Sequence, residues 1–375
     1  MKTSKFFKIS LIYFISLVLF VCLRIFFQLD IFQNISPIFQ DILSTGIIQV
    51  VLMFALPFGL YLLFFKKKPK ETFKDLGFQK ISGKAVLISI IIGVVAFILN
   101  IAVSSIFNGI IQAFGYNPSY GSGGGASTSV WNFLLEVLLV AILPGICEEF
   151  MHRGILLRGL SKEKGVMYAL VVSSILFGLM HLNIVQVFYA SILGFLIGFV
   201  SVIGKSIYPA IIIHFMNNFL NVYLSYAEPN GWPLGEFYNE INYFFQNNNF
   251  LIVVFVIVII LLFLIFLLFV LLMQLLKISS FESFRRVLLK VRTDLNPSVV
   301  SYEKRNELEN EMDYLNDVTP IIMDNLQHNK LSLDSFLNVN ESDKKKLFFK
   351  DKFILYATFI MGILITIFTF IWGVI

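Results

Sequence analysis

Apolar segments long enough to cross a bilayer alternate with short polar segments along most of the chain. A membrane-spanning helix needs about 20 mostly apolar residues. Nine segments meet or approach this length, and they lie at 6–29, 46–65, 84–106, 129–160, 165–182, 184–203, 206–226, 249–276 and 353–375. The pattern predicts an all-α fold, a polytopic transmembrane bundle of about nine helices. The segments 165–182 and 184–203 are the least typical spans.

Composition points to the same environment. Of the 375 residues, 57% are hydrophobic and only 14% are charged, whereas about a quarter of the residues in soluble domains are charged. We therefore expect a multi-pass protein of the cell membrane, with the lipid bilayer as a partner and no nucleic acid. The apolar run that ends at Leu29 has no small-residue cleavage site after it, which predicts a retained first helix.

Basic residues gather in alternate loops. The segment 66–84 holds seven lysines, whereas 30–45, 107–130 and 227–248 contain no lysine or arginine. Positively charged loops stay on the cytoplasmic side of a membrane. The alternation therefore predicts a cytoplasmic N-terminus and an extracytoplasmic C-terminus.

One long polar stretch, 277–352, interrupts the apolar pattern. It carries thirteen basic and thirteen acidic residues, and its mixed-charge patterns predict a small cytosolic helical insert. Its first part, SSFESFRRVLLKVR, is a basic amphipathic sequence that we expect to lie on the anionic inner leaflet.

The sequence ICEEFMHRG places ionisable side chains inside an apolar segment. A charged side chain at the bilayer centre costs roughly 2.5–3.5 kcal/mol on insertion scales. Counting from the cytoplasmic helix ends at the α-helical rise places Glu148 about 18 Å deep, His181 about 24 Å and His214 about 14 Å. These depths lie well inside a hydrocarbon core about 30 Å thick. We therefore expect the three side chains to share a polar cavity.

This depth requires the helix that carries the glutamates to continue beyond Cys147. If the helix ended there, ILLRGL would be an isolated apolar turn, so we expect it to reach about Leu160. Pro144 and Gly145 then form a kink or break within the helix.

Helical spacing pairs several of the polar side chains. Glu149 and Arg153 are four positions apart, so they can form an ion pair on one face of the helix. His214 and Asn218 have the same spacing and project from one face. His152 points about 100° away from Arg153, and we expect it to pack or to line the cavity.

Three motifs follow one another along the chain: EExxxR from Glu148, FxxxH from Phe177 and HxxxN from His214. Within the second motif, the ring of Phe177 is expected to pack beside His181. In this order the three motifs resemble the CPBP family of intramembrane proteases, which includes the CAAX prenyl endopeptidases and the bacterial Abi proteins linked to bacteriocin maturation and immunity. The resemblance implies a protease-like transmembrane core at 129–226. The remaining parts are N-terminal transmembrane helices at 1–128, an outer loop and eighth helix at 227–276, the insert at 277–352 and a C-terminal transmembrane helix at 353–375.

Peptide hydrolysis gives these residues candidate roles. The reaction needs a base that activates a water and donors that stabilise the oxyanion. Glu148 is the candidate general base, and His181 is expected to share and orient the water. His214 and Asn218 are expected to donate N–H groups to the tetrahedral intermediate. By resemblance these four positions are catalytic and the glutamate–arginine pair supports them, which predicts a membrane-embedded endopeptidase acting on a membrane-associated protein or peptide.

A metal-dependent variant stays open beside this mechanism. Glu148, His181 and His214 offer the three ligands of a catalytic zinc, with a fourth position for water, and the family is often labelled a metalloprotease. The sequence contains no HExxH motif. We favour the metal-independent glutamate mechanism.

Two other functions compete with proteolysis. A membrane protein of the same fold that captures a peptide, for example an immunity factor for a bacteriocin, would not need the catalytic groups. A transporter is disfavoured because one half of the chain shows no repeat in the other.

Overall fold

The computed structural model confirms the predicted all-α fold. It describes residues 4–27, 29, 35–116, 129–247, 250–294 and 349–374. These residues contain no strand, and the structure is 87% helical. The predicted insert lies largely outside the described residues, because 295–348 is not part of them.

The described helices include π-helical segments, which carry the label η. The N-terminal part contains α1 (Lys5–Phe26), α3 (Pro37–Asp41), η1 (Ile42–Ala55), α4 (Leu56–Phe65), α5 (Pro69–Asp75) and α6 (Gly83–Ala113). The middle part contains α7 (Val130–Glu136), η2 (Val137–Ile142), α8 (Leu143–Glu149), η3 (Phe150–Leu157), α9 (Arg158–Lys164), α10 (Val166–Leu179), α11 (Ile184–Ile203) and α12 (Tyr208–Ala227). The C-terminal part contains α13 (Gly235–Asn247), α14 (Phe250–Asp294) and α18 (Phe349–Val374).

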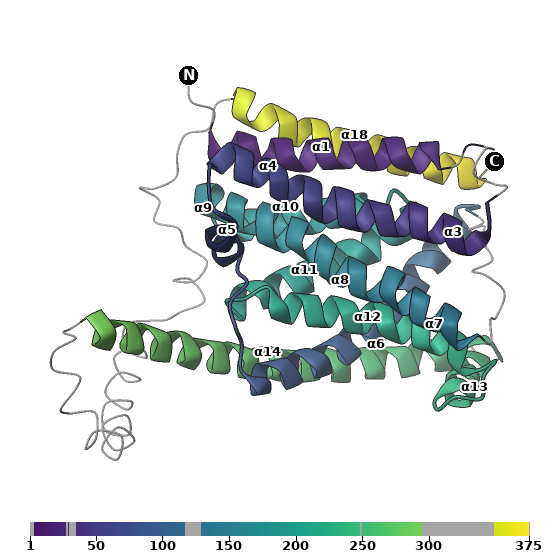
Figure 1. Ribbon diagram of the computed structural model, residues 1–375. Coiled ribbons are helices and arrows are strands. Elements are labelled where there is room, and N and C mark those ends of the chain that lie inside the picture. Colours follow the sequence, from purple (N-terminus) through teal and green to yellow (C-terminus); the bar gives the residue numbers. More distant parts are fainter. Residues whose placement is uncertain are drawn as a thin grey trace, which may run out of the picture.

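Seven of the described helices are long and apolar enough to cross a membrane. They are Lys5–Phe26, Phe39–Phe65, Gly83–Ala113, Val130–Lys164, Ile184–Ile203, Phe255–Phe281 and Asp351–Ile371. Two of the nine predicted spans are not among these seven. The segment 165–182 forms the 14-residue helix α10, and the 20-residue α12 carries a histidine and several asparagines in its apolar sequence. Both are packed between other helices of the bundle (Figure 1).

The helix that carries the glutamates continues past Cys147, as its apolar sequence predicts. It runs without a break from Val130 to Lys164 and ends at Gly165, whose positive φ of 91° stops the helix. The expected kink near Pro144 takes the form of the π-helical segment η2 directly before it. A wider π turn leaves room for a proline ring within a continuous helix.

One end of the bundle collects the basic segments. Lys8 Nζ at the start of α1 donates to Phe64 O at the end of α4, at 2.9 Å. Ile207 N donates to Gly77 O at 2.9 Å, which joins the loop before α12 to the lysine-rich segment. The Arg158 side chain packs directly over Gly77. The N-terminus, the lysine-rich segment and the loop before α12 therefore share one end of the bundle.

Helices α1 and α18 lie side by side and run in the same direction (Figure 1). Their first turns are joined by a hydrogen bond of 2.7 Å from Ser4 Oγ to Asp351 Oδ1. The two helices therefore end together at the opposite end of the bundle.

Helix α14 continues beyond the boundary predicted at residue 276. Its 45 residues run to Asp294, which corresponds to about 68 Å at the α-helical rise. Its C-terminal part extends past the other helices (Figure 1). The sequence SSFESFRRVLLKVR therefore continues a membrane helix, because the helical pattern is not interrupted between the apolar and the basic parts.

Small residues allow α10 and α11 to pack closely. A Cβ on Gly198 would lie 2.6 Å from Leu170 Cδ1, and one on Gly194 would lie 3.0 Å from Phe177 Cδ1. These two glycines therefore let the two helices approach closely. The closest backbone approach is at Gly178, where a Cβ would lie 2.4 Å from the carbonyl oxygen of Val187.

Gly178→Ala is expected to destabilise the bundle strongly, because the methyl group would collide with a backbone atom that cannot rotate away. We expect a fall of several degrees in the thermal unfolding midpoint in detergent, with a reduced yield of folded protein. Gly59→Ala is the matched control, since nothing lies within 4 Å of a Cβ at Gly59. Equal midpoints for the two variants would contradict the proposed packing.

Candidate active site

Glu149, Arg153 and His214 form a buried hydrogen-bonded group. Arg153 Nη1 and His214 Nδ1 both donate to Glu149 Oε1, each at 2.8 Å. The glutamate and the arginine are 0% exposed, and the histidine is 3% exposed. The predicted ion pair between Glu149, at the end of α8, and Arg153, on η3, is confirmed. The structure adds His214 of α12 to this pair.

The ring of Phe177 on α10 lies next to Arg153 and next to three histidines of the site. Its ring centroid lies 5.0 Å from that of His152, 5.2 Å from that of His181 and 5.6 Å from that of His214. The Arg153 guanidinium carbon lies 4.5 Å from the same centroid, close enough for a cation–π interaction. The predicted contact between Phe177 and His181 is confirmed, and one aromatic ring brings three motif segments together.

His181 lies in the turn after α10, and the prediction that a spanning helix continues to residue 182 is wrong. The helix ends at Leu179, and Leu182 adopts a positive φ of 52° before α11 begins. His181 Nδ1 donates to Phe177 O at 2.9 Å. A carbonyl oxygen only accepts hydrogen bonds, so the Nδ1 atom carries the hydrogen, and Nε2 can serve a substrate or a water.

Asn218 is held by two neighbours. Its Nδ2 donates to Val140 O at 2.9 Å, and its Oδ1 accepts a hydrogen bond of 3.0 Å from Asn217 Nδ2. These contacts fix the orientation of the amide, and within the described part of the chain they use one of the two N–H groups of Nδ2. The side chain lies against η2 and has no hydrogen bond to Glu148 among the described residues.

The two adjacent glutamates have different environments. Glu148 is half-buried, and its side chain makes one hydrogen bond with the described residues, from Gln49 Nε2 to Oε1 at 2.6 Å. Glu149 is held by an arginine and by a histidine that can become cationic. An unpaired carboxylate accepts a proton more readily than one paired with arginine. Of the two, Glu148 is therefore the one with the chemistry of a base.

His152 is buried and hydrogen-bonded on both ring nitrogens. Nδ1 donates to Glu148 O at 2.8 Å, and Nε2 lies 3.1 Å from the hydroxyl of Tyr13 on α1. The same hydroxyl lies 2.9 Å from Leu176 O. The expected packing role of His152 is consistent with these contacts, which also tie the backbone of the glutamate turn to α1 and α10.

Tyr13→Phe is expected to lower stability by about 1–3 kcal/mol, because it leaves buried hydrogen-bonding groups of His152 and Leu176 without the hydroxyl. Cleavage per folded molecule is expected to fall less than tenfold. The thermal midpoint in detergent measures the first effect. Tyr61→Phe is the control, since the Tyr61 hydroxyl makes no hydrogen bond with the described residues. A midpoint equal to that of Tyr61→Phe would contradict the role of the hydroxyl.

The described residues do not assemble a metal-binding group. No set of three or more His, Cys, Asp and Glu side chains among them is close enough to hold a metal ion. In the proposed ligand set, His214 donates from Nδ1 to Glu149 and His181 donates from Nδ1 to Phe177 O, so these contacts do not use Nε2 of either ring. Metal-binding histidines usually donate their other ring N–H in this way, but no step of the proposed mechanism is assigned to a metal ion.

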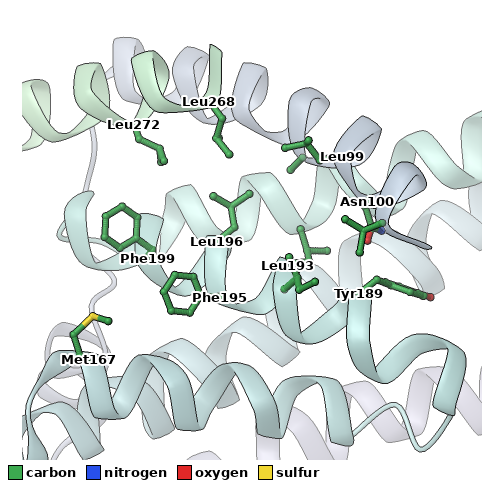
Figure 2. Close-up of a pocket in the computed structure, with 13 residues that line it drawn as sticks. Leu99, Asn100, Met167, Tyr189, Leu193, Phe195, Leu196, Phe199, Leu268 and Leu272 are labelled. Carbon is green, nitrogen blue, oxygen red and sulfur yellow. The ribbon is translucent and has the colours of Figure 1, made fainter. Parts of the chain in front are cut away.

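An apolar pocket of about 460 Å³ lies between α6, α11 and α14 (Figure 2). Leucine and phenylalanine side chains dominate its lining, as Figure 2 shows for Leu196, Phe195 and Leu268. Asn100 lies at one end of it, and its Nδ2 donates to Asn217 Oδ1 at 3.3 Å. The pocket therefore ends at the chain of amides that leads to Asn218.

The segment that carries this site also matches a family of membrane proteases. Residues 130–220 match the family described as type II CAAX prenyl endopeptidase Rce1-like. This match confirms the predicted CPBP-type relationship for the core of the chain. The matched segment includes all six candidate residues, from Glu148 to Asn218. Comparison with curated proteins and with solved structures gave no match.

The Rce1-like match supports a protease-type enzyme of the membrane. Together with the apolar helices, it indicates a multi-pass membrane protein. Neither Gln49 nor Tyr13 belongs to the matched segment, and the sequence motifs do not include them. For Gln49 a signal was present in the sequence, since it is the one amide in the apolar stretch GIIQVVLMFALP.

Proposed function

We propose that the protein is an intramembrane endopeptidase that hydrolyses a peptide bond through a water activated by Glu148. The observation that carries the proposal is the contrast between two adjacent glutamates. Glu149 accepts at Oε1 from the permanent cation Arg153 and from His214, whereas the one described partner of the Glu148 side chain is the neutral amide of Gln49. The Rce1-like match supports the reaction class.

In the first step, the Glu148 carboxylate takes a proton from the water as the water oxygen bonds to the peptide carbonyl carbon. The carbonyl π electrons move to oxygen and form an oxyanion. The second Nδ2–H of Asn218 and the Nε2–H of a protonated His214 donate to that oxyanion. Glu149 stabilises the protonated ring through Nδ1, and His181 Nε2 accepts the second hydrogen of the water.

In the second step, the tetrahedral intermediate collapses. The carbonyl re-forms, the C–N bond breaks, and Glu148 returns its proton to the departing nitrogen. The products are a carboxylic acid and an amine, and the glutamate is again ionised. The reaction consumes one water and no other co-reactant.

We also propose that the basic end of the bundle faces the cytoplasm, which places the N-terminus inside and the C-terminus outside. The loops at that end carry the lysines of the segment 66–84. A hydrogen bond to Asp75 raises the pKa of Lys67 and favours its cationic form. Positive loops are retained in the cytoplasm. Cysteine accessibility at a residue of α5 and at a residue of α13 tests the orientation, since only the latter is expected to react from outside intact cells.

Cleavage by the reconstituted protein tests the proposed function. Two probes are used in liposomes: a fluorogenic peptide that ends in a farnesylated CAAX sequence, and the same peptide without the farnesyl group. The apolar pocket beside Asn100 supports a lipid-modified substrate, so the farnesylated probe is expected to be cleaved faster. Absence of cleavage of both probes, and of a panel of membrane-inserted peptides, would contradict the proposal.

Chelation is expected to leave cleavage unchanged. Under the proposed mechanism the proton acceptor and the oxyanion donors are side chains, so no step needs a metal ion. The measurement is kcat after treatment with a chelator, with the metal content of the protein determined in parallel. Loss of activity on metal removal, restored by zinc alone, would contradict the metal-independent mechanism.

A further inference from the structure

Gln49 is a buried amide in the middle of an apolar span. It lies on η1, is 7% exposed and packs against α8, the helix that ends in the two glutamates. A polar side chain in hydrocarbon surroundings is costly unless it is hydrogen-bonded. The Gln49 side chain is therefore expected to have a hydrogen-bond partner.

The partner of Gln49 is the carboxylate of Glu148. The Nε2 atom donates to Oε1 at 2.6 Å, a short distance typical of hydrogen bonds to an ionised group. Only the N–H side of an amide can face a carboxylate, so the amide orientation is fixed. Gln49 Oε1 takes no part in this contact.

The second polar atom of the amide is the more informative one. Gln49 Oε1 is buried and has no hydrogen-bond partner among the described residues. Most buried polar atoms have a hydrogen-bond partner, so this acceptor is available for one further partner. An acceptor next to the carboxylate is suited to receive one hydrogen of a water that gives its other hydrogen to that carboxylate.

We propose that Gln49 is a positioning residue of the hydrolytic site, which fixes the Glu148 carboxylate through Nε2 and accepts a hydrogen bond from the attacking water through Oε1. The inference rests on the proposed function and extends the site to η1, outside the Rce1-like segment. Glu148 takes one hydrogen of the water, and Gln49 Oε1 and His181 Nε2 share the other in a three-centre hydrogen bond. The bond-making and bond-breaking steps of the attack are unchanged.

Replacing Gln49 with methionine tests the proposal, because methionine fills a similar volume without a hydrogen bond. In the reconstituted protein we expect kcat for the farnesylated probe to fall about 10- to 100-fold, with KM within about twofold of wild type. Gln40→Met is the matched control, since the Gln40 amide donates to the backbone at Ile35 O, away from the site. It is expected to keep wild-type kcat.

Gln49→Glu separates positioning from packing. A protonated glutamic acid presents a donor and an acceptor as the amide does, whereas the ionised form does not. Its kcat, relative to wild type at the same pH, is therefore expected to rise as the pH is lowered, while that of Gln49→Met stays low. A purely structural role would instead change the thermal midpoint of both variants and leave this pH dependence absent.

A second measurement does not depend on cleavage. Dicyclohexylcarbodiimide modifies protonated carboxyl groups inside membranes, and mass spectrometry gives its rate at Glu148. Loss of the N–H donor favours the neutral carboxyl, so Gln49→Met is expected to be labelled several-fold faster than wild type and Gln40→Met is not. Equal labelling rates, or a kcat of Gln49→Met within twofold of wild type, would overturn the proposal. A wild-type protein that cleaves no probe would instead overturn the proposed function.

Discussion

Replacing Glu148 with glutamine is expected to lower kcat for peptide cleavage by about 10³-fold, within the range attributed to a general base. The change keeps the shape of the side chain and removes its capacity to accept the proton of the water. Glu149 is not expected to take over this task, because protonation would cost its buried ion pair with Arg153. The thermal midpoint and the affinity for the probe are expected to stay close to those of wild type.

Glu136→Gln is the matched control for this variant. Glu136 lies on the same continuous helix, where it accepts a hydrogen bond of 2.9 Å from Tyr226 OH, and glutamine can accept the same bond. Its kcat is expected to equal that of wild type. A Glu148→Gln protein that cleaves at the wild-type rate would contradict the mechanism. Probe binding without any cleavage by wild type would instead favour the peptide-binding alternative.

The apolar pattern predicted the fold well because span length is a local property. A helix such as α6 needs only its own apolar residues to be recognised. The pattern failed where chain packing decides the end of a helix. The turn at His181 lies where α10 packs closely on α11 near Gly178, and α14 continues through a change from apolar to basic sequence.

Side-chain contacts within the site were predicted where both residues share a helix. Contacts between residues on different helices were missed. The pair of Glu149 and Arg153 follows from their spacing alone. The hydrogen bonds from Gln49 and to Tyr13 join helices that are about one hundred or more positions apart in sequence. Spacing rules contain no information on which helix packs beside which, so these partners required the structure.

Replacing Arg153 with methionine is expected to have the largest effect on stability. It removes the permanent positive charge beside Glu149 and leaves a carboxylate that is 0% exposed. Breaking a buried ion pair on one side costs about 3–5 kcal/mol. The backbone carbonyl of Gly194, which accepts from Arg153 Nη2 at 2.8 Å, also loses its donor. We expect little folded protein, measured as monodisperse yield and thermal midpoint in detergent.

The paired variant Glu149→Gln with Arg153→Met distinguishes the ion pair from the packing of the arginine. It removes both charges, so no uncompensated carboxylate stays buried and the midpoint is expected to recover most of the loss. Activity is not expected to recover, because glutamine accepts the hydrogen bond from His214 Nδ1 without stabilising a protonated ring. A midpoint as low as that of Arg153→Met would show that the arginine acts by filling space, and recovered cleavage would contradict the role of Glu149 behind His214.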